Sequence, residues 1–127
     1  MKKSPRGFTL IEVMVALAVF AVIASSVVLV NTRAISNAAQ LENRLYGLWV
    51  AENKMAELRI VGAPAINDYE VEESNFGRDW VVRWTVEDAQ SADYGSYVRR
   101  VTVRSFLHQE GDLRDVASLV ALIQVPL

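Results

Sequence analysis

The sequence predicts an α+β protein in which a long N-terminal α-helix packs on a small C-terminal antiparallel β-sheet. Three observations carry that prediction. Residues 8–30 hold 19 apolar side chains among 23, residues 31–60 repeat apolar side chains at helical spacing, and the segments after Pro64 alternate as strands do. A length of 127 residues suits a single domain and argues against a multidomain enzyme.

Residues 8–30 have the length and composition of a membrane span. Val13–Val30 contains no charged side chain. A helix over residues 8–30 would run about 34 Å, enough to cross a hydrocarbon core of about 30 Å. Lys2, Lys3 and Arg6 precede it, and the rest of the chain has 10 basic and 15 acidic side chains. The positive-inside bias therefore predicts a cytoplasmic N-terminus and an outward C-terminal body, periplasmic in a bacterium.

Three interpretations of this N-terminal segment are open on these grounds. A cleaved secretory signal has a possible cut site at Ser36-Asn37-Ala38, but its apolar core should be only 7–15 residues long. A plain signal anchor fits the length. The third interpretation begins from Glu12, a carboxylate one helical turn into the apolar run, where acids are costly and usually have a partner or a function.

Residues 31–60 are expected to continue the helix with an amphipathic surface. Apolar side chains recur every three or four residues, with Glu52 taking one slot, and Gly62 and Pro64 then signal the helix end. The members of this apolar stripe are Ile35, Ala38, Leu41, Leu45, Leu48, Met55 and Leu58. We expect the stripe to dock the C-terminal domain. The segment is either an assembly stem or the helical stalk of an anchor.

The C-terminal region is predicted to form an antiparallel sheet with one polar face. The expected strands are Trp80–Glu87, Arg99–Ser105 and Leu119–Val125, closed by Pro126, with Tyr69–Glu72 as a weaker edge candidate. Alternation places Trp80, Val82, Trp84 and Val86 on the core face. Arg83 and Glu87 are expected to face Arg100 and Arg104 on the polar side. Residues 89–96 and 107–115 are expected to be surface loops.

No group of residues in this region predicts catalysis. His108 is the only histidine and falls in an expected loop, while Glu87, Asp88 and Asp93 lack the ligand spacing of a calcium loop. The chain has no cysteine and no glycine-rich phosphate loop. Its acidic body does not suit nucleic acid. We expect no enzyme activity, no metal or cofactor, no nucleic-acid partner and no small-molecule substrate.

The segment Gly7-Phe8-Thr9-Leu10-Ile11-Glu12, after a basic leader and before an apolar helix, resembles the processing site of type IV prepilins and pseudopilins. The resemblance implies that a membrane prepilin peptidase cuts between Gly7 and Phe8 and methylates the new terminus to N-methylphenylalanine. Glu12 then becomes the acid at the fifth mature position. The chemistry agrees, because glycine lets a protease approach the backbone and the new ammonium gives Glu12 a partner on its own or a neighbouring subunit.

The subclass rests on a second segment. Trp49–Arg59 looks like the stem of I-class minor pseudopilins of type II secretion, which are similar in length. Adhesive pilins usually carry a disulfide, and this chain has no cysteine. The resemblance implies a leader at residues 1–7, a membrane and filament-core helix at 8–30, a stem at 31–60 and a periplasmic sheet domain at 61–127.

The same resemblance implies a place in a machine. After removal of the leader, the helix would leave the inner membrane and join a short periplasmic filament. The I-class subunit is expected at the filament tip with the J- and K-class subunits, where it primes assembly of the major pseudopilin. That filament helps folded proteins leave the periplasm through the outer membrane, and a separate ATPase supplies the energy.

Two other functions fit the same residues. One is a minor pilin of a type IV pilus or competence machine, with identical processing and different partners. The other is a single-pass anchored periplasmic protein that is never cut at Gly7.

Overall fold

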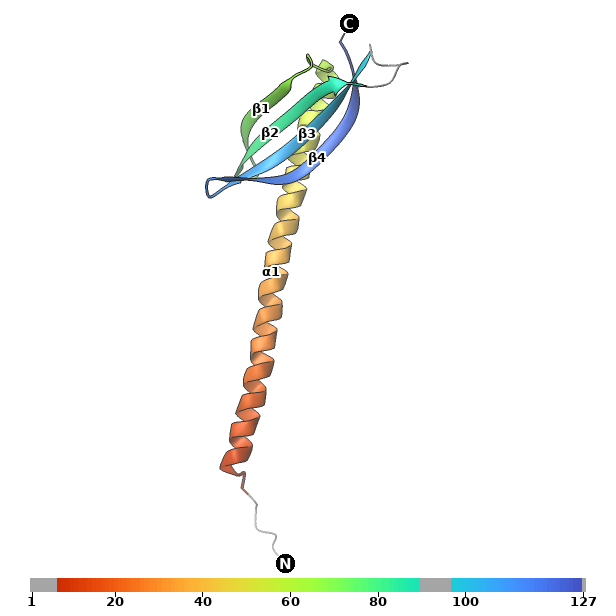
Figure 1. The fold of residues 1–127 in the computed structure, drawn as a ribbon. Coiled ribbons are helices and arrows are strands. Elements are labelled where there is room, and N and C mark those ends of the chain that lie inside the picture. The colour runs from red at the N-terminus through yellow and green to blue at the C-terminus, as the bar shows by residue number, and fades with distance from the viewer. Residues whose placement is uncertain (1–6, 90–96, 127) are drawn as a thin grey trace, which may run out of the picture. The chain divides into compact units, whose positions relative to one another are not determined.

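The computed structural model describes residues 7–89 and 97–126 and shows one helix and four strands (Figure 1). The elements are α1 (Leu10–Val61), β1 (Asp68–Asn75), β2 (Arg78–Asp88), β3 (Val98–Gln109) and β4 (Asp112–Gln124). The α+β prediction is confirmed. The chain divides into two compact units, Met1–Ala39 and Gln40–Leu127, and α1 contributes to both.

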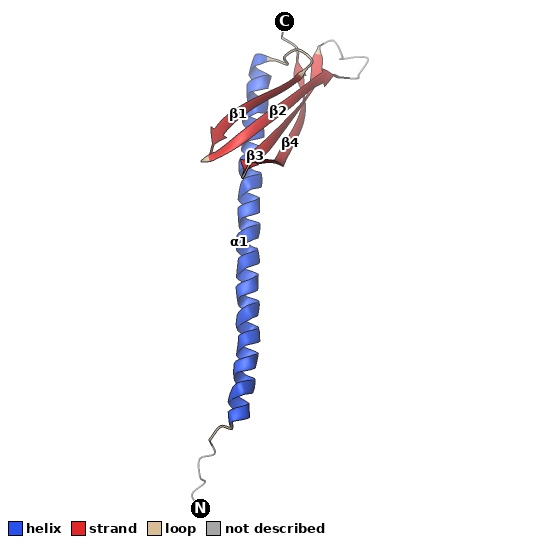
Figure 2. Cartoon of the chain, turned by 60° about the vertical axis from the view of Figure 1, so that its left-hand side comes forward, coloured by secondary structure: helices blue, strands red, loops and turns tan. Residues whose placement is uncertain are grey.

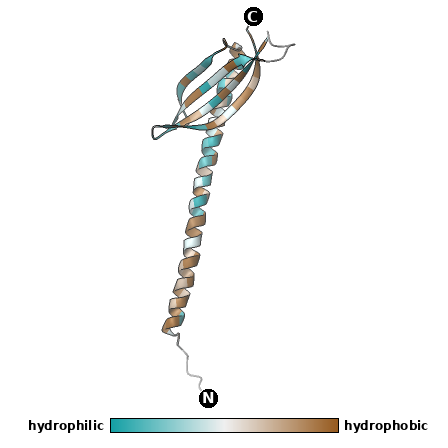
Figure 3. Ribbon diagram, in the orientation of Figure 1, coloured by the Kyte–Doolittle hydropathy of each residue, from teal (hydrophilic) through white to brown (hydrophobic). Residues whose placement is uncertain are grey.

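In the first unit, α1 has no buried side chain. Its apolar residues face outward on every side, and Figure 3 shows the lower turns of the helix as mostly hydrophobic. An 18-residue window of this helix has a mean hydropathy of 2.9, and the helix is long and apolar enough to cross a membrane. The hydroxyls of Ser25 and Ser26 donate to the carbonyl oxygens of Ala21 and Val22, four residues earlier. Because both hydroxyls are hydrogen-bonded within the helix, neither donor would be unpaired in a lipid environment.

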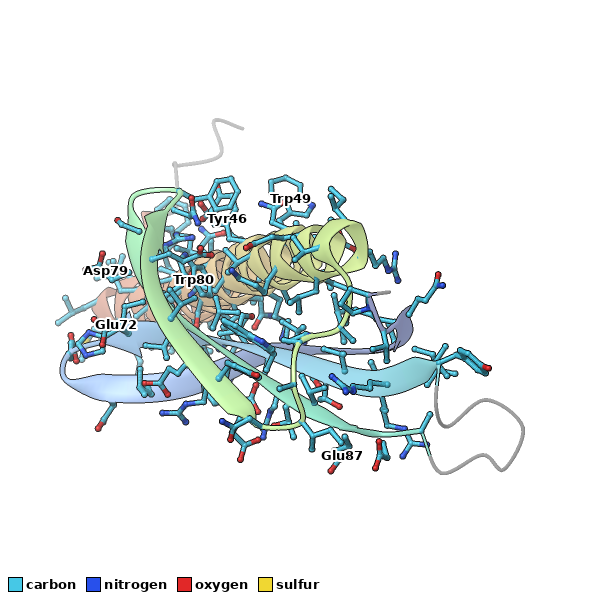
Figure 4. The ribbon with its side chains drawn as sticks, turned by 90° about the horizontal axis from the view of Figure 1, so that it is seen from above. Tyr46, Trp49, Glu72, Asp79, Trp80 and Glu87 are labelled. Atoms are coloured by element: carbon cyan, nitrogen blue, oxygen red, sulfur yellow. The ribbon has the colours of Figure 1, made fainter. Side chains whose placement is uncertain are left out.

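In the second unit, a four-stranded antiparallel sheet in the order β1-β2-β3-β4 packs on the C-terminal portion of α1 (Figure 2). The alternation predicted for β2 is confirmed, because Trp80, Val82 and Val86 are fully buried and Trp84 packs against them. Figure 4 shows Trp80 between the helix and the strands. The core is completed from the helix side by Val50, Ala51, Met55 and Leu58.

The apolar stripe predicted on the stem was only partly right. Met55 and Leu58 are buried as expected, but Leu41 is 59% exposed and Leu45 is 45% exposed. The face that meets the sheet is instead begun by Gly47, Val50 and Ala51. Gly47 and Ala51 are small, so the helix lies closer to the strands than a leucine stripe would allow. A Cβ placed on Gly47 would meet Val116 Cγ1 at 2.4 Å.

The predicted loop at residues 107–115 was wrong, because β3 and β4 extend through it and leave only Glu110 and Gly111 as a turn. Both turn residues have positive φ, 54° and 89°, which is the backbone of a tight two-residue hairpin. Charged side chains suggested a loop, yet they occupy the exposed positions of paired strands. The β1–β2 hairpin repeats the pattern with Phe76 at φ 57° and Gly77 at φ 68°.

Two cross-strand ion pairs lie on the outer face of the sheet. Register places Arg83 opposite Arg104, and each cation pairs with a carboxylate of its other neighbouring strand: Arg83 with Glu70, and Arg104 with Asp115. The two guanidinium groups flank the ring of Phe106, with ring-centre distances of 4.8 and 5.3 Å. The cross-strand pairs thereby shield an apolar residue on the solvent face.

The end of α1 is fixed to the end of β4. Gly62 adopts a φ of 93° and its N–H donates to the carbonyl oxygen of Leu58 at 2.9 Å, which is a left-handed helix cap that glycine adopts without steric cost. The next N–H, of Ala63, donates to the carbonyl oxygen of Gln124 at 2.9 Å. The helix stop predicted at Gly62 is confirmed.

Candidate functional site

The proposed processing site lies in an open stretch of backbone. Gly7 precedes the helix, and a Cβ built on it would meet nothing within 4 Å. Phe8 is 84% exposed. A protease that must wrap an extended substrate needs such unobstructed backbone, and the described residues place nothing over the Gly7–Phe8 bond.

Thr9 ends this open stretch and begins the helix. Its Oγ1 accepts a hydrogen bond from the N–H of Glu12 at 3.2 Å, and its carbonyl accepts from Val13 at 3.2 Å. Thr9 is therefore the N-cap, and Glu12 occupies the third helical position, the spacing of a capping box. The sequence analysis missed this signal. The helix consequently starts at Leu10 and leaves Gly7 and Phe8 outside it.

Glu12 lies on the same side of the first unit as Phe8. The two residues line one shallow hollow together with Val13, Ala16, Leu17 and Phe20. Within the described part of the chain, no cation lies in ion-pair distance of the Glu12 carboxylate. The acid is close to the point where cleavage would create an ammonium, and it is the one acidic side chain in the first turn.

Residues considered for catalysis are distributed differently from the prediction. His108 belongs to β3 rather than to a loop, and it lines a hollow of about 330 Å³ with Glu72, Ser74 and Asp79. Glu87 and Asp88 end β2 and are exposed, while Asp93 lies outside the described residues. Across residues 7–89 and 97–126, no group of three histidine or acidic side chains is arranged to hold a metal ion.

Three aromatic side chains that the sequence pattern did not group together form a cluster on the second unit. Tyr46 and Phe76 stack with ring centres 4.7 Å apart, and Trp49 approaches both at 5.7–5.9 Å. Trp49 is 47% exposed and packs against these rings rather than in the core (Figure 4). Phe76 stands in the β1–β2 turn, with a φ of 57°, so the tip of this hairpin contacts the helix.

Comparison with known families agrees with the two segments singled out in the sequence. Residues 41–124 match the family described as type II secretion system (T2SS), protein I. Residues 2–28 match the prokaryotic N-terminal methylation motif. The two matches lie in different parts of the chain: the C-terminal part matches the protein I family, and the N-terminal part matches the methylation motif.

Individual relatives give the same result over nearly the whole chain. A type II secretion system protein I of Pseudomonas aeruginosa is 33% identical over 117 residues, 91% of each chain. The protein I of Escherichia coli is 36% identical over 107 residues, 83% of each chain, and that of Vibrio cholerae is 36% identical over 91 residues, 72% of this chain and 75% of the relative. The chain belongs to the type II secretion system protein I family, whose members are pseudopilins.

Proposed function

We propose that this chain is a minor pseudopilin that is cut between Gly7 and Phe8, methylated on Phe8, and assembled at the tip of a type II secretion pseudopilus, where it initiates filament growth. Residues 1–7 are the leader, 8–30 the membrane and filament-core helix, 31–60 the stem and 61–127 the periplasmic domain. The observation that carries the proposal is the open Gly7–Phe8 backbone followed at once by Glu12 in the first helical turn.

Cleavage at this bond explains why an acid is kept in an apolar helix. A new α-amino group has a pKa near 8, so Phe8 would carry a positive charge at neutral pH. Glu12 lines the same hollow as Phe8, within reach of an ammonium on its own or an adjacent subunit. A paired acid and amine can be buried among apolar helices, whereas an unpaired carboxylate there is strongly unfavourable.

The exposed apolar portion of α1 requires two successive environments. In the inner membrane, lipid covers its apolar surface, with the N-terminus cytoplasmic and the sheet domain periplasmic. In a filament, helices of other subunits replace the lipid without exposing the surface to water. Prepilin peptidase, the J- and K-class subunits and the major pseudopilin are the proposed partners. The chain supplies structure, and no catalytic role is proposed for it.

The processing step is tested by the mass of the N-terminal peptide. The full chain is expressed with a prepilin peptidase, extracted from membranes and digested. We expect a peptide that begins at Phe8 and carries one methyl group. Gly7→Leu should retain the leader because its side chain obstructs the backbone, whereas the matched leader variant Ser4→Leu should be processed normally. A wild-type peptide that begins at Met1, or after Ala38, contradicts the proposal.

The tip position is tested separately, in cells that overproduce the major pseudopilin and form visible filaments. Gold-labelled antibody against this chain should mark one filament end, and deletion of the chain should lower the number of filaments. Labelling along the whole filament, or an unchanged filament number, would contradict tip placement and initiation while leaving membership of the family intact.

A further inference from the structure

The two edges of the sheet are built in opposite ways. β1, one edge, is eight residues long, and half of its side chains are acidic: Asp68, Glu70, Glu72 and Glu73. Charged and short edge strands discourage pairing with other chains. The N–H of Asp68 is also occupied, because it donates to Oδ1 of Asn67 at 2.9 Å. Edge β1 is therefore protected.

β4, the other edge, lacks these protections. It is 13 residues long, and Val116–Val125 contains neither a charged residue nor a proline. Val120 and Leu122 are 64% and 63% exposed, although both lie in a regular strand. Among the described residues, β3 is the only strand that pairs with β4. An uncharged and mostly apolar edge segment such as residues 116–124 favours the addition of another strand.

The backbone groups that face the open side can be assigned from the hydrogen bonds at the strand end. The N–H of Val125 donates to the carbonyl oxygen of Tyr97, next to β3, whereas the carbonyl oxygen of Gln124 points away and accepts from Ala63. The direction alternates along an antiparallel strand. The N–H and C=O groups of Ser118, Val120 and Leu122 therefore point away from β3.

We propose that the β4 edge at residues 118–122 binds an extended strand of a neighbouring pseudopilin subunit, which continues the sheet. This inference rests on the proposed function, because it takes the partner from the same filament. The partner strand should be uncharged over about five residues, since a charge beside Val120 and Leu122 would lose its water without gaining a counter-ion from residues 116–125. Apolar side chains at alternate positions would extend the surface made by Val120 and Leu122.

A proline substitution tests whether the outward backbone N–H groups of β4 bind the partner. Val120→Pro removes one outward N–H and leaves the β3–β4 hydrogen bonds in place, which edge strands tolerate. Glu72→Pro is the matched control on the other edge. The carbonyl oxygen of Asn67 accepts from the N–H of Val86, so the odd-numbered residues of β1 bond to β2 and the N–H of Glu72 points away from β2. We expect Val120→Pro to lower co-purified partner subunit at least tenfold and Glu72→Pro to leave it unchanged, with tryptophan fluorescence showing both variants folded.

A substitution that adds a charge provides a second test in case the proline variant fails to fold. Val120→Lys keeps the backbone and adds a charge at an exposed position, and it should lower co-purification to a similar degree. Ile66→Lys, at a 52% exposed apolar residue of the same unit, is the control that should have no effect. Equal co-purification by wild type and Val120→Lys would overturn the proposal.

Cross-linking and hydrogen exchange identify the chain that binds to the β4 edge. The chain has no native cysteine, so Val120→Cys carries a photo-cross-linker at one site, and Glu72→Cys is the control. We expect an adduct from Val120→Cys with a partner subunit, and slower exchange of the Ser118–Leu122 amides only in the complex. An adduct with a second copy of this chain, or amides already protected in the isolated chain, would overturn the proposal. Failure of wild type to co-purify any subunit would instead contradict the proposed function.

Discussion

The two portions of α1, Leu10–Ala39 and Gln40–Val61, use the same secondary structure for opposite purposes. In the first portion every apolar side chain is exposed or nearly so, and the one carboxylate, Glu12, has no ion-pair partner among the described residues. In the second portion one face is buried and two of the acids have partners in the chain: Glu42 with Arg78, and Glu57 with Lys54.

The difference shows where the chain needs other molecules. Burial of apolar surface is the main driving force of folding, and the second portion obtains it from its own sheet. The first portion obtains none within its own unit, so its stability in the cell depends on lipid or on other helices. Substitutions in the second portion should therefore change the free energy of unfolding, and substitutions in the first should change assembly.

The largest effect is expected from Glu12→Leu in the first portion. The variant should still enter the membrane, because it makes the helix more apolar. Within a filament it would leave the Phe8 ammonium without its counter-ion, which costs about 3–5 kcal/mol for a broken buried pair, or more than a hundredfold in assembly. Co-purification of partner subunits measures this, with Val13→Leu as the uncharged control. Equal recovery of partners by Glu12→Leu and wild type would remove the proposed role of Glu12.

A contrast of about 3 kcal/mol is expected between Met55→Ala and Leu41→Ala. Met55 is 3% exposed, so its truncation leaves a cavity that costs about 2–5 kcal/mol, whereas Leu41 is 59% exposed and its loss should stay within about 0.5 kcal/mol. Urea unfolding of the full chain in detergent measures both, followed by the fluorescence of Trp49, Trp80 and Trp84, which all lie in the second unit. Equal losses would mean that Leu41 is buried as the original stripe predicted.

That contrast also shows which features of the structure could be predicted from the sequence and which could not. Helical period and apolar content predicted the helix and its end, and alternation predicted the buried face of β2. The contact face of the stem was predicted only in part, because a pattern of large apolar residues includes Met55 and Leu58 but omits the small residues Gly47 and Ala51. The proposed site at Gly7, Phe8 and Glu12 could be suggested from the sequence because its basic leader, glycine and acid lie close together along the chain. The open β4 edge was not, because it depends on which strand lies last in the sheet.

A smaller loss, about 2 kcal/mol, is expected for Gly47→Ala. Alanine is the better helix former by about 1 kcal/mol, but its Cβ would overlap Val116 Cγ1 at 2.4 Å and force the helix away from β4. Adding two methyl groups to the first portion, as in Ala18→Val, should leave urea unfolding within about 0.5 kcal/mol, because that side chain is exposed. Removing the obstructing methyls with Val116→Ala should restore part of the stability of Gly47→Ala. A stabilised Gly47→Ala variant would show that the close approach is absent.

The smallest and most discriminating difference is between Ser105→Ala and Ser25→Ala. Each hydroxyl donates to a helix carbonyl at 2.7 Å, Ser105 to Gly47 and Ser25 to Ala21, but Ser105 is fully buried and joins β3 to the helix. Ser105→Ala should cost about 1 kcal/mol, because the Gly47 carbonyl keeps its intrahelical bond and loses only the second one. Ser25→Ala should leave the urea midpoint unchanged, since its bond lies within one helical turn and connects nothing else. If both variants lose the same stability, hydrogen bonding inside the helix matters as much as attachment to the sheet, and the distinction between the two portions of α1 fails.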